Sequence, residues 1–311
     1  MVALAWLSLA TPTLALDLSW PVDCILGDTC HIQQYPDDDP GPAANDFTCG
    51  PLSYDGHDGT DIALPNRAAM ADGVAVLAAA PGKVGGVRDG VADFAPVVAG
   101  RECGNGVLID HGDGWVTQYC HLRQGSVLVK PGDTVDTGSH LGLIGQSGLA
   151  EFPHVHLVVR KDGADIDPFA PNATACSVSP GPTLWAEPVA YEPGGFLAAG
   201  FSDAVPDFDA ILAGLPTPPL PLPATAPGLV LWAHAFGTRT GDDLVFTITG
   251  PEGAFLAEAV AIDRTQAQMF RALGKRLTKA TWPSGSYAGT VSLMRGGKAI
   301  DRIETHVTVG E

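Results

Sequence analysis

Glycine and proline interrupt this sequence so often that short strands and turns, rather than long helices, are expected over most of it. The 311 residues include 38 Gly and 26 Pro, which favour turns and interrupt the interiors of helices and strands. Between them, from residue 47 to residue 170, lie short runs rich in Val, Leu and Ile, residue types that favour β-strands. These runs are residues 74–80, 106–110, 115–119, 139–144 and 154–159. We therefore predict an all-β fold, with a compact antiparallel β-sheet domain over residues 17–176.

The second half of the chain contains two segments that differ in composition and in hydrophobic pattern. Residues 177–227 contain eleven of the prolines, which favour extended polyproline conformation over helix or central strand. We interpret this segment as an irregular Pro-rich arm followed by a stiff linker, with one short helical turn near residues 207–213. Alternating strands then return and predict an immunoglobulin-like β-sandwich over residues 228–311. That domain has no clustered His or carboxylate groups, so docking to an unknown partner or a role in stability is expected of it.

The first 16 residues contain no charged side chain and are mostly apolar. They suit the apolar region of a secretory signal peptide, with small residues near Ala15 for cleavage, although a positively charged start is missing. A buried first strand is the alternative. A signal peptide over residues 1–16 predicts that the mature protein is periplasmic or secreted.

The six cysteines agree with export, because disulfides persist in oxidising compartments. One pair brackets a short turn, a second pair flanks a predicted hairpin, and the third pair is what remains. The predicted disulfides are Cys24–Cys30, Cys103–Cys120 and Cys49–Cys176. Free buried thiols are the alternative interpretation.

The charge balance is strongly acidic, with 17 Lys and Arg against 35 Asp and Glu and a net charge of −18. Nucleic acid is not an expected partner, because binding to phosphates needs clustered Lys and Arg. No stretch approaches the ~20 consecutive apolar residues of a transmembrane helix, so no membrane span is expected.

Three short segments carry the histidines of greatest interest. The first is His57-Asp-Gly-Thr-Asp61, the second contains His121, and the third is His154-Val-His156. Side chains two positions apart in a strand point to the same face, so His154 and His156 project together from a run of Val and Leu. Two imidazoles on an apolar strand are costly unless a metal or hydrogen bonds satisfy them. The third segment therefore indicates a functional site.

The glycines around the first segment favour a loop, which can fold His57 and Asp61 onto one ion. With one histidine of the third segment they provide two imidazoles and a carboxylate, a set that suits Zn²⁺ and leaves a fourth position for water. His121 and the other histidine would then orient that water and steady the oxyanion formed during amide hydrolysis. These residues alone leave open which of His154 and His156 binds the metal.

The same segments, with the sequence between them, resemble a known family. His57-x-x-x-Asp61 followed by His154-x-His156 is similar in order and spacing to the signature of the lysostaphin/LytM-type zinc metallopeptidases, which cut the peptide part of bacterial peptidoglycan. The resemblance extends over about residues 50–170, including the sequence around Tyr119-Cys-His-Leu. It implies a β-sheet peptidase domain with a groove.

Carried over by position, the resemblance makes His57, Asp61 and His156 the zinc ligands, and it makes His121 and His154 the catalytic histidines. It implies a zinc-dependent metalloendopeptidase that hydrolyses peptide bonds in peptidoglycan through a zinc-activated water. The implied cofactor is Zn²⁺, and the implied substrates are peptidoglycan peptides.

The chain departs from the family pattern at three positions. Cys120 stands where Ala is common, in agreement with a local disulfide, and Glu151 and Phe152 replace small or polar residues. The last two departures concern the preference of substrate subsites rather than the metal.

Other polar and aromatic residues are interpreted as structural. Asp58 is expected to be a solvated turn residue, and Asp110 to brace a hairpin or a histidine. Trp115 and Tyr119 are expected in the core or in a groove wall. The solitary histidines, which are expected outside the site, are His31, His111, His140, His234 and His306.

Two alternative functions are compatible with the same residues. One is a non-catalytic cell-wall-binding or hydrolase-regulating module, which would bind wall peptides without hydrolysing them. The other is a zinc peptidase that acts on a protein or on a self-made inhibitory segment, with residues 177–227 covering the groove.

Overall fold

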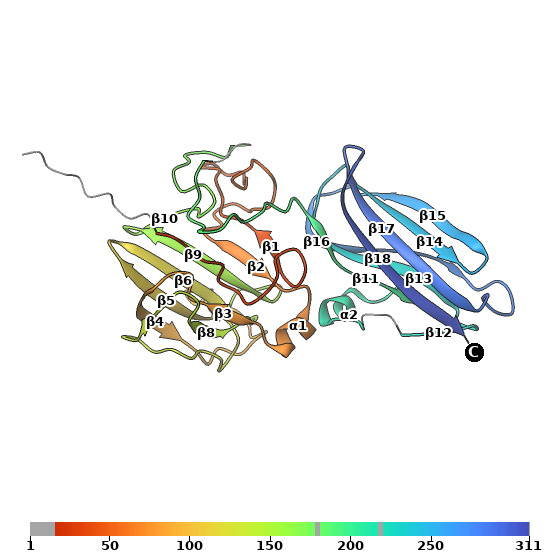
Figure 1. Cartoon of the computed structure of the whole chain (residues 1–311), viewed down its shortest axis with the longest axis horizontal. Helices are drawn as coiled ribbons and strands as arrows, with labels where there is room; N and C mark the ends of the chain where they lie inside the picture. Colours follow the sequence, from red (N-terminus) through yellow and green to blue (C-terminus); the bar gives the residue numbers. More distant parts are fainter. Residues whose placement is uncertain (1–15, 178–180, 217–219, 311) are drawn as a thin grey trace, which may run out of the picture.

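The computed structural model describes residues 16–177, 181–216 and 220–310, and nearly all of their regular structure is β-strand (Figure 1). The helices within these ranges are short, α1 (Arg67–Asp72) and α2 (Phe208–Ala213), and neither could cross a membrane. The prediction of an all-β fold is confirmed. The predicted signal peptide, except for its last residue, lies outside the described ranges.

The first lobe, which contains β1 to β10 (Figure 1), is built on an antiparallel sheet. The strand order of this sheet is β1-β2-β9-β6-β5-β4-β7, and β10 pairs with β9. Its strands are β1 (His31–Gln34), β2 (Thr60–Ala63), β4 (Gly82–Arg88), β5 (Asn105–Gly112), β6 (Trp115–Leu122), β7 (Thr134–Val135), β9 (His154–Lys161) and β10 (Ala164–Asp165). A second, smaller sheet pairs β3 (Ala75–Leu77) with β8 (His140–Leu143). Each of the five predicted β-type runs therefore contains a strand.

Alternation along β9 separates the core of this lobe from its functional face. Val155, Leu157 and Val159 are buried in one hydrophobic cluster. His154 and His156 point to the opposite face of the sheet, as the two-residue period of a strand requires. The apolar half of β9 thus anchors the strand and leaves its histidines free for chemistry.

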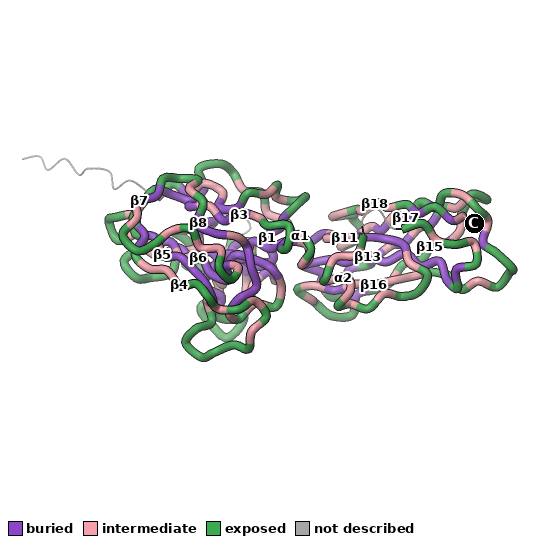
Figure 2. Tube along the Cα trace, turned by 90° about the horizontal axis from the view of Figure 1, so that it is seen from below, coloured by how far each residue is buried: buried purple, intermediate pink, exposed green. Residues whose placement is uncertain are grey.

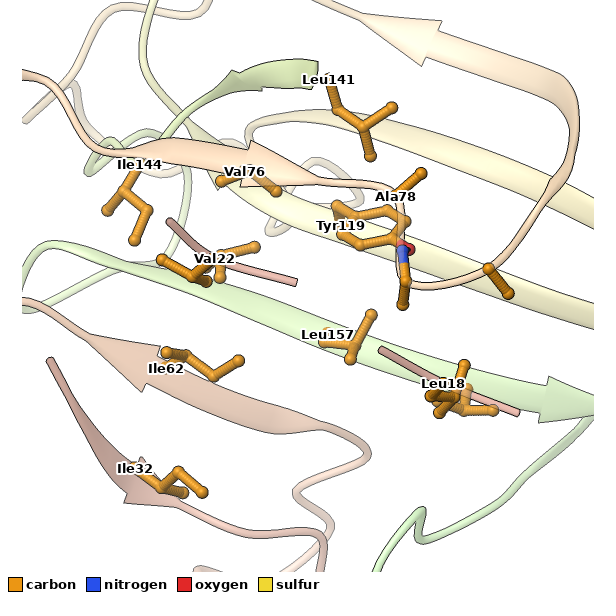
Figure 3. Close-up of a cluster of buried hydrophobic side chains, with 14 of the residues drawn as sticks. Leu18, Val22, Ile32, Ile62, Val76, Ala78, Tyr119, Leu141, Ile144 and Leu157 are labelled. Carbon is orange, nitrogen blue, oxygen red and sulfur yellow. The ribbon is translucent and has the colours of Figure 1, made fainter. Parts of the chain in front are cut away.

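The core packs the main sheet against the smaller one. Ile62 of β2, Val76 of β3 and Tyr119 of β6 are fully buried within it (Figure 3). The Tyr119 hydroxyl accepts a hydrogen bond from the backbone N–H of Ala79 at 2.8 Å, which avoids the cost of a buried unpaired polar group. Tyr119 is therefore a core residue, as predicted.

The second lobe consists of two sheets that share one core. The first contains β11 (Gly195–Ser202), β13 (Gly228–Thr238) and β16 (Gln266–Arg276). The second contains β12 (Leu222–Pro223), β18 (Lys298–Gly310), β17 (Gly285–Arg295), β14 (Asp243–Gly250) and β15 (Gly253–Ala261). Leu231, Phe246 and Val291 bring both sheets into the shared core. The two packed sheets agree with the predicted sandwich, and its immunoglobulin-like character stays a prediction.

The structure differs from the predicted irregular arm over part of its length. β11 lies inside residues 177–227, yet it is a regular strand that pairs with β13 in the second lobe. Residues 194–205 contain none of the eleven prolines, so nothing there prevents a strand, and Ala199 and Phe201 enter the core. The predicted helical turn is present as α2.

The two lobes lie end to end and meet through β1 and β16 (Figures 1 and 2). The Gln33 side chain donates a hydrogen bond to the Ala267 carbonyl at 2.8 Å and accepts one from the Gln268 side chain at 2.8 Å. The His31 ring packs on Phe236 with ring centroids 4.5 Å apart. Burial lowers the pKa of His31 to about 4, so a neutral ring makes this contact near neutral pH.

Three disulfides reinforce the first lobe, and the described residues contain no free cysteine. The pairing is the predicted one, namely Cys24–Cys30, Cys49–Cys176 and Cys103–Cys120. The last of these joins the segment before β5 to β6, next to His121.

Candidate active site

Strand pairing places the first and third histidine segments side by side. β2 and β9 are antiparallel neighbours, and Asp61 lies directly opposite His156 in their register. Opposite residues on adjacent strands share one face of a sheet. His57 precedes β2 in a loop that includes Gly59, where an added Cβ atom would come within 2.7 Å of the His156 ring. Glycine at this position therefore leaves room for the His156 side chain.

Three donor atoms from these segments converge on one point. The distance from His57 Nε2 to Asp61 Oδ1 is 3.3 Å, and that from His156 Nδ1 to the same oxygen is 2.8 Å. His57 Nε2 and His156 Nδ1 are 3.2 Å apart. A tetrahedral metal with bonds of ~2.0–2.1 Å would have its ligand atoms ~3.3 Å apart, so the three side chains fit a metal site.

Hydrogen bonds at the far side of each imidazole determine which nitrogen faces this point. His57 Nδ1 lies 2.7 Å from the Tyr35 carbonyl oxygen, and His156 Nε2 lies 3.0 Å from Asp58 Oδ1. Because these oxygens only accept hydrogen bonds, they hold a proton on the outer nitrogen of each ring. The facing nitrogen is then the one that can give its lone pair to a metal, once binding releases any proton that it carries. Arg160 in turn approaches Asp58 at 3.4 Å. Asp58 thus keeps 42% of its side chain exposed, as expected of a solvated residue, but it also holds His156, and its place directly after His57 was the only signal of that contact in the sequence.

The Asp61 carboxylate stays ionised in this cluster. Burial raises the pKa of Asp61, but His154, His57 and a hydrogen bond from His156 hold it well below its usual value. For His156 the effect of burial has the opposite sign and lowers the pKa. Hydrogen bonds to Asp58 and Asp61 outweigh it and raise the pKa to about 9. Asp61 thus supplies negative charge where the histidines meet.

His121 and His154 lie beside this group with ring centroids 4.6 Å apart. Nδ1 of His121 lies 2.8 Å from the Ser147 carbonyl oxygen, and Nδ1 of His154 lies 2.8 Å from that of Phe152. Each Nδ1 therefore donates, and each Nε2 offers a lone pair. Burial lowers the pKa of His121 to about 3 and also lowers that of His154, so both rings are neutral proton acceptors near neutral pH.

His121 faces the groove only because the strand alternation of β6 breaks at its end. Cys120 faces the groove and Tyr119 the core, so regular alternation would turn His121 toward the core. Instead, His121 has a φ of 64°, a left-handed conformation that is uncommon outside glycine. This backbone bend is what presents its ring to the groove.

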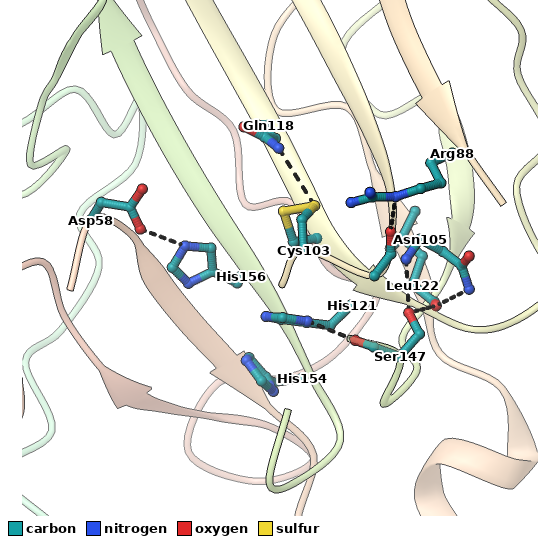
Figure 4. Close-up of a disulfide and its surroundings, with 12 residues drawn as sticks. Asp58, Arg88, Cys103, Asn105, Gln118, His121, Leu122, Ser147, His154 and His156 are labelled. Carbon is teal, nitrogen blue, oxygen red and sulfur yellow. Dashed lines mark hydrogen bonds and ion pairs between the residues drawn. A yellow bond between two sulfur atoms is a disulfide. The ribbon is translucent and has the colours of Figure 1, made fainter. Parts of the chain in front are cut away.

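Backbone contacts and a disulfide support the bend (Figure 4). The His121 backbone N–H donates to the Cys103 carbonyl at 2.8 Å, and the Cys103–Cys120 disulfide joins the same two segments. Ser147, which accepts from the His121 ring, also donates its hydroxyl to the Leu122 carbonyl at 2.7 Å. The imidazole is thus held from both its backbone and its ring.

Asp61, His121, His154 and His156 line a groove with a volume of about 560 Å³, and the buried His57 lies behind Asp61. The other walls of the groove are mostly aromatic, aliphatic and acidic, and one wall residue comes from the second lobe. These residues include Gln34, Tyr54, Glu102, Leu149, Glu151, Phe152 and Ala267. None of the described residues in 177–227 lines the groove, so this part of the arm does not cover it.

The solitary histidines lie outside the groove, as predicted. His111, for example, is bonded through Nδ1 to the Pro81 carbonyl at 2.7 Å and through Nε2 to the Thr117 hydroxyl at 2.8 Å. Asp110 accepts a hydrogen bond from the Gly112 backbone N–H at 2.9 Å and so braces the hairpin.

Part of the chain is similar to curated proteins. The chain is 31% identical over 124 residues to peptidoglycan DD-endopeptidase ShyA of Vibrio cholerae, which is 40% of this chain and 25% of ShyA. It is 35% identical over 104 residues to the cell division protein DipM of Caulobacter vibrioides, which is 33% of this chain and 14% of DipM. The chain thus spans a quarter or less of the length of these relatives.

Solved structures also match part of the chain. The catalytic domain of the M23 protein EnpA from Enterococcus faecalis is 26% identical, with a TM-score of 0.32, over 45% of this chain and 88% of that domain. The catalytic domain of lysostaphin from Staphylococcus simulans is 25% identical, with a TM-score of 0.28, over 36% of this chain and 76% of that domain. The match to peptidase family M23 covers residues 55–168, which include every histidine and aspartate of the converging cluster. Residues 55–168 thus match peptidase family M23, in agreement with the resemblance to a metallopeptidase family that the sequence motifs indicate.

Proposed function

We propose that this protein is a zinc-dependent metalloendopeptidase that hydrolyses peptide bonds in bacterial peptidoglycan. The observation that carries the proposal is that Asp61, His121, His154 and His156 line one groove in the region that matches family M23. The buried His57 lies directly behind them, with its Nε2 3.3 Å from Asp61 Oδ1. The name of ShyA, a peptidoglycan DD-endopeptidase, supports the substrate class.

The proposed zinc ligands are His57 Nε2, Asp61 Oδ1 and His156 Nδ1. Two nitrogens and a carboxylate oxygen are a donor set that Zn²⁺ prefers. Nε2 of His154 approaches Asp61 Oδ1 at 3.4 Å, but His156 Nδ1 lies close to both Asp61 Oδ1 and His57 Nε2, at 2.8 and 3.2 Å. His156 is therefore the better third ligand. When bound, Zn²⁺ supplies Lewis acidity that polarises the scissile carbonyl and lowers the pKa of a water molecule.

His121 and His154 are the proposed catalytic residues. Their Nε2 lone pairs accept a proton from the attacking water, and the low pKa of each ring favours passing that proton on to the leaving amine. While protonated, either ring can donate a hydrogen bond to the oxyanion of the tetrahedral intermediate. The carbonyls of Ser147 and Phe152 hold the two rings in the orientation that this requires.

A periplasmic or secreted location follows from the proposed substrate, because peptidoglycan lies outside the cytoplasm. The three disulfides of the first lobe support this location, since such bonds persist in oxidising compartments.

Mass spectrometry of a peptidoglycan digest tests the proposal. Zinc-loaded protein incubated with purified sacculi is expected to release soluble muropeptides, with one water added at each cleaved peptide bond. A chelator should stop the release, and added zinc should restore it. Binding to sacculi without any cleaved bond would contradict the proposal and favour a non-catalytic wall-binding module.

Replacing Asp58 with alanine is expected to weaken zinc binding by ~10–100-fold, the usual effect of losing a carboxylate that orients a metal-bound histidine. Without Asp58, nothing holds the proton on His156 Nε2, and the ring can turn its lone pair away from the metal. Competition with a chelator would measure the affinity. Asp55→Ala is the matched control, because Asp55 is an exposed carboxylate of the same loop; equal affinities in the two variants would refute the role of Asp58.

A further inference from the structure

The second lobe contributes to the groove, although it lies outside the M23 match. Ala267, at the start of β16, is an exposed residue that lines the groove together with His121, His154 and His156. Resting on the proposed function, we propose that the second lobe forms one wall of the substrate groove, and that Gln34 and Ala267 form a subsite for an extended peptide.

Contacts between the lobes hold this wall in place. Gln33 is hydrogen-bonded both to the Ala267 carbonyl and to the Gln268 side chain, each at 2.8 Å. The tilted contact between the His31 and Phe236 rings lies at the same junction. These contacts join β1 to β16, so Ala267 has a defined position relative to the groove.

Gln34 connects this wall to the proposed metal site. A β-bulge between Ile32 and Gln34 breaks the alternation of β1, so that Ile32 enters the core, Gln33 reaches the second lobe and Gln34 lines the groove. Gln34 pairs with Asp61 in the register of β1 and β2, so it lies next to a proposed zinc ligand. The subsite is therefore adjacent to the reacting centre.

The chemistry of Gln34 suits a peptide backbone. The residue is 9% exposed, and its Oε1 is buried without a hydrogen-bond partner among the described residues. Buried polar atoms usually have a partner, and rotation of the carboxamide would turn Oε1 toward the groove, where a substrate N–H would provide one. A carboxamide can also donate to a carbonyl, so Gln34 can match both backbone groups of an extended peptide, while the small Ala267 leaves space for the chain to pass.

Two groove variants and one control test the subsite in zinc-loaded, full-length protein. Ala267→Trp fills the space beside the wall, and Gln34→Leu removes the amide while keeping a similar volume. Ala259→Trp is the control, because Ala259 is an exposed alanine on β15 in the other sheet of the second lobe. The probe is a purified cross-linked muropeptide dimer, whose Kd is measured by calorimetry in a His154→Ala background and whose KM and kcat are measured without it.

Both groove variants are expected to raise Kd and KM about tenfold, with kcat within about twofold of wild type, as loss of uniform substrate binding requires. The control should match wild type. Groove variants that bind and turn over the dimer like Ala259→Trp would overturn the subsite and leave the proposed function intact. If unmodified protein cleaves nothing, the proposed function fails, and the comparison of Kd values still decides whether the wall binds the peptide.

Discussion

Replacing His57 with alanine is expected to remove bound zinc and to lower hydrolysis of peptidoglycan by about 10³-fold or more. His57 Nε2 lies 3.3 Å from Asp61 Oδ1 and 3.2 Å from His156 Nδ1. Without it, only two donors remain, fewer than the three protein ligands of catalytic zinc sites. Zinc content by elemental analysis and release of soluble muropeptides are the two measurements.

His140→Ala is the matched control for this variant. His140 is an exposed histidine on β8 of the same lobe and does not line the groove. It should keep the zinc content and activity of the unmodified protein. A His57→Ala protein with stoichiometric zinc and undiminished hydrolysis would rule out the proposed metal site.

Alanine substitution of His121 or His154 is expected to give a different pattern, in which zinc is retained and kcat falls by ~10²–10⁴-fold, the usual contribution of a general acid or base. Both rings keep Nε2 as a proton acceptor because a backbone carbonyl accepts from Nδ1. Neither is needed to complete the group formed by His57, Asp61 and His156. Parallel measurement of kcat and zinc content separates loss of proton transfer from loss of metal.

The double variant adds a second criterion. If His121 and His154 act as one proton-transfer unit, the double variant should be little worse than the more damaging single variant, because residues that act together are not additive. Loss of zinc from His154→Ala, with zinc retained in His156→Ala, would reverse the assignment of the two histidines. Activity close to wild type in both single variants would exclude a catalytic role for either residue.

The strands of the first lobe were largely predictable because their signals are local. A run such as residues 154–159 shows its strand character within a few residues, and the two-residue period alone places His154 and His156 on one face. The disulfide pairs were predictable for a related reason, since Cys103 and Cys120 flank a hairpin whose strands must return side by side. Resemblance to a known family then singled out the five residues that the structure brings together.

Signals that depend on the composition of a whole segment were less dependable. β11 was missed because the proline content of residues 177–227 was averaged over a segment whose residues 194–205 contain no proline. The role of Asp58 was missed because a carboxylate after a histidine looks the same whether it faces solvent or a ring on another strand. Only the position of β9 beside β2 decides between these possibilities.

Local pattern thus established the residue types for a metal site, their presentation on strands and loops, and the disulfide framework. Long-range packing decided that His156 rather than His154 completes the three-donor group, that His121 turns to the groove through a left-handed backbone, and that Ala267 closes one side. The physical reason for this division is that the two-residue alternation of strands and the residue preferences of turns act over only a few residues. The distance between two imidazoles on different strands, or between two lobes, depends instead on how the entire chain buries its apolar side chains.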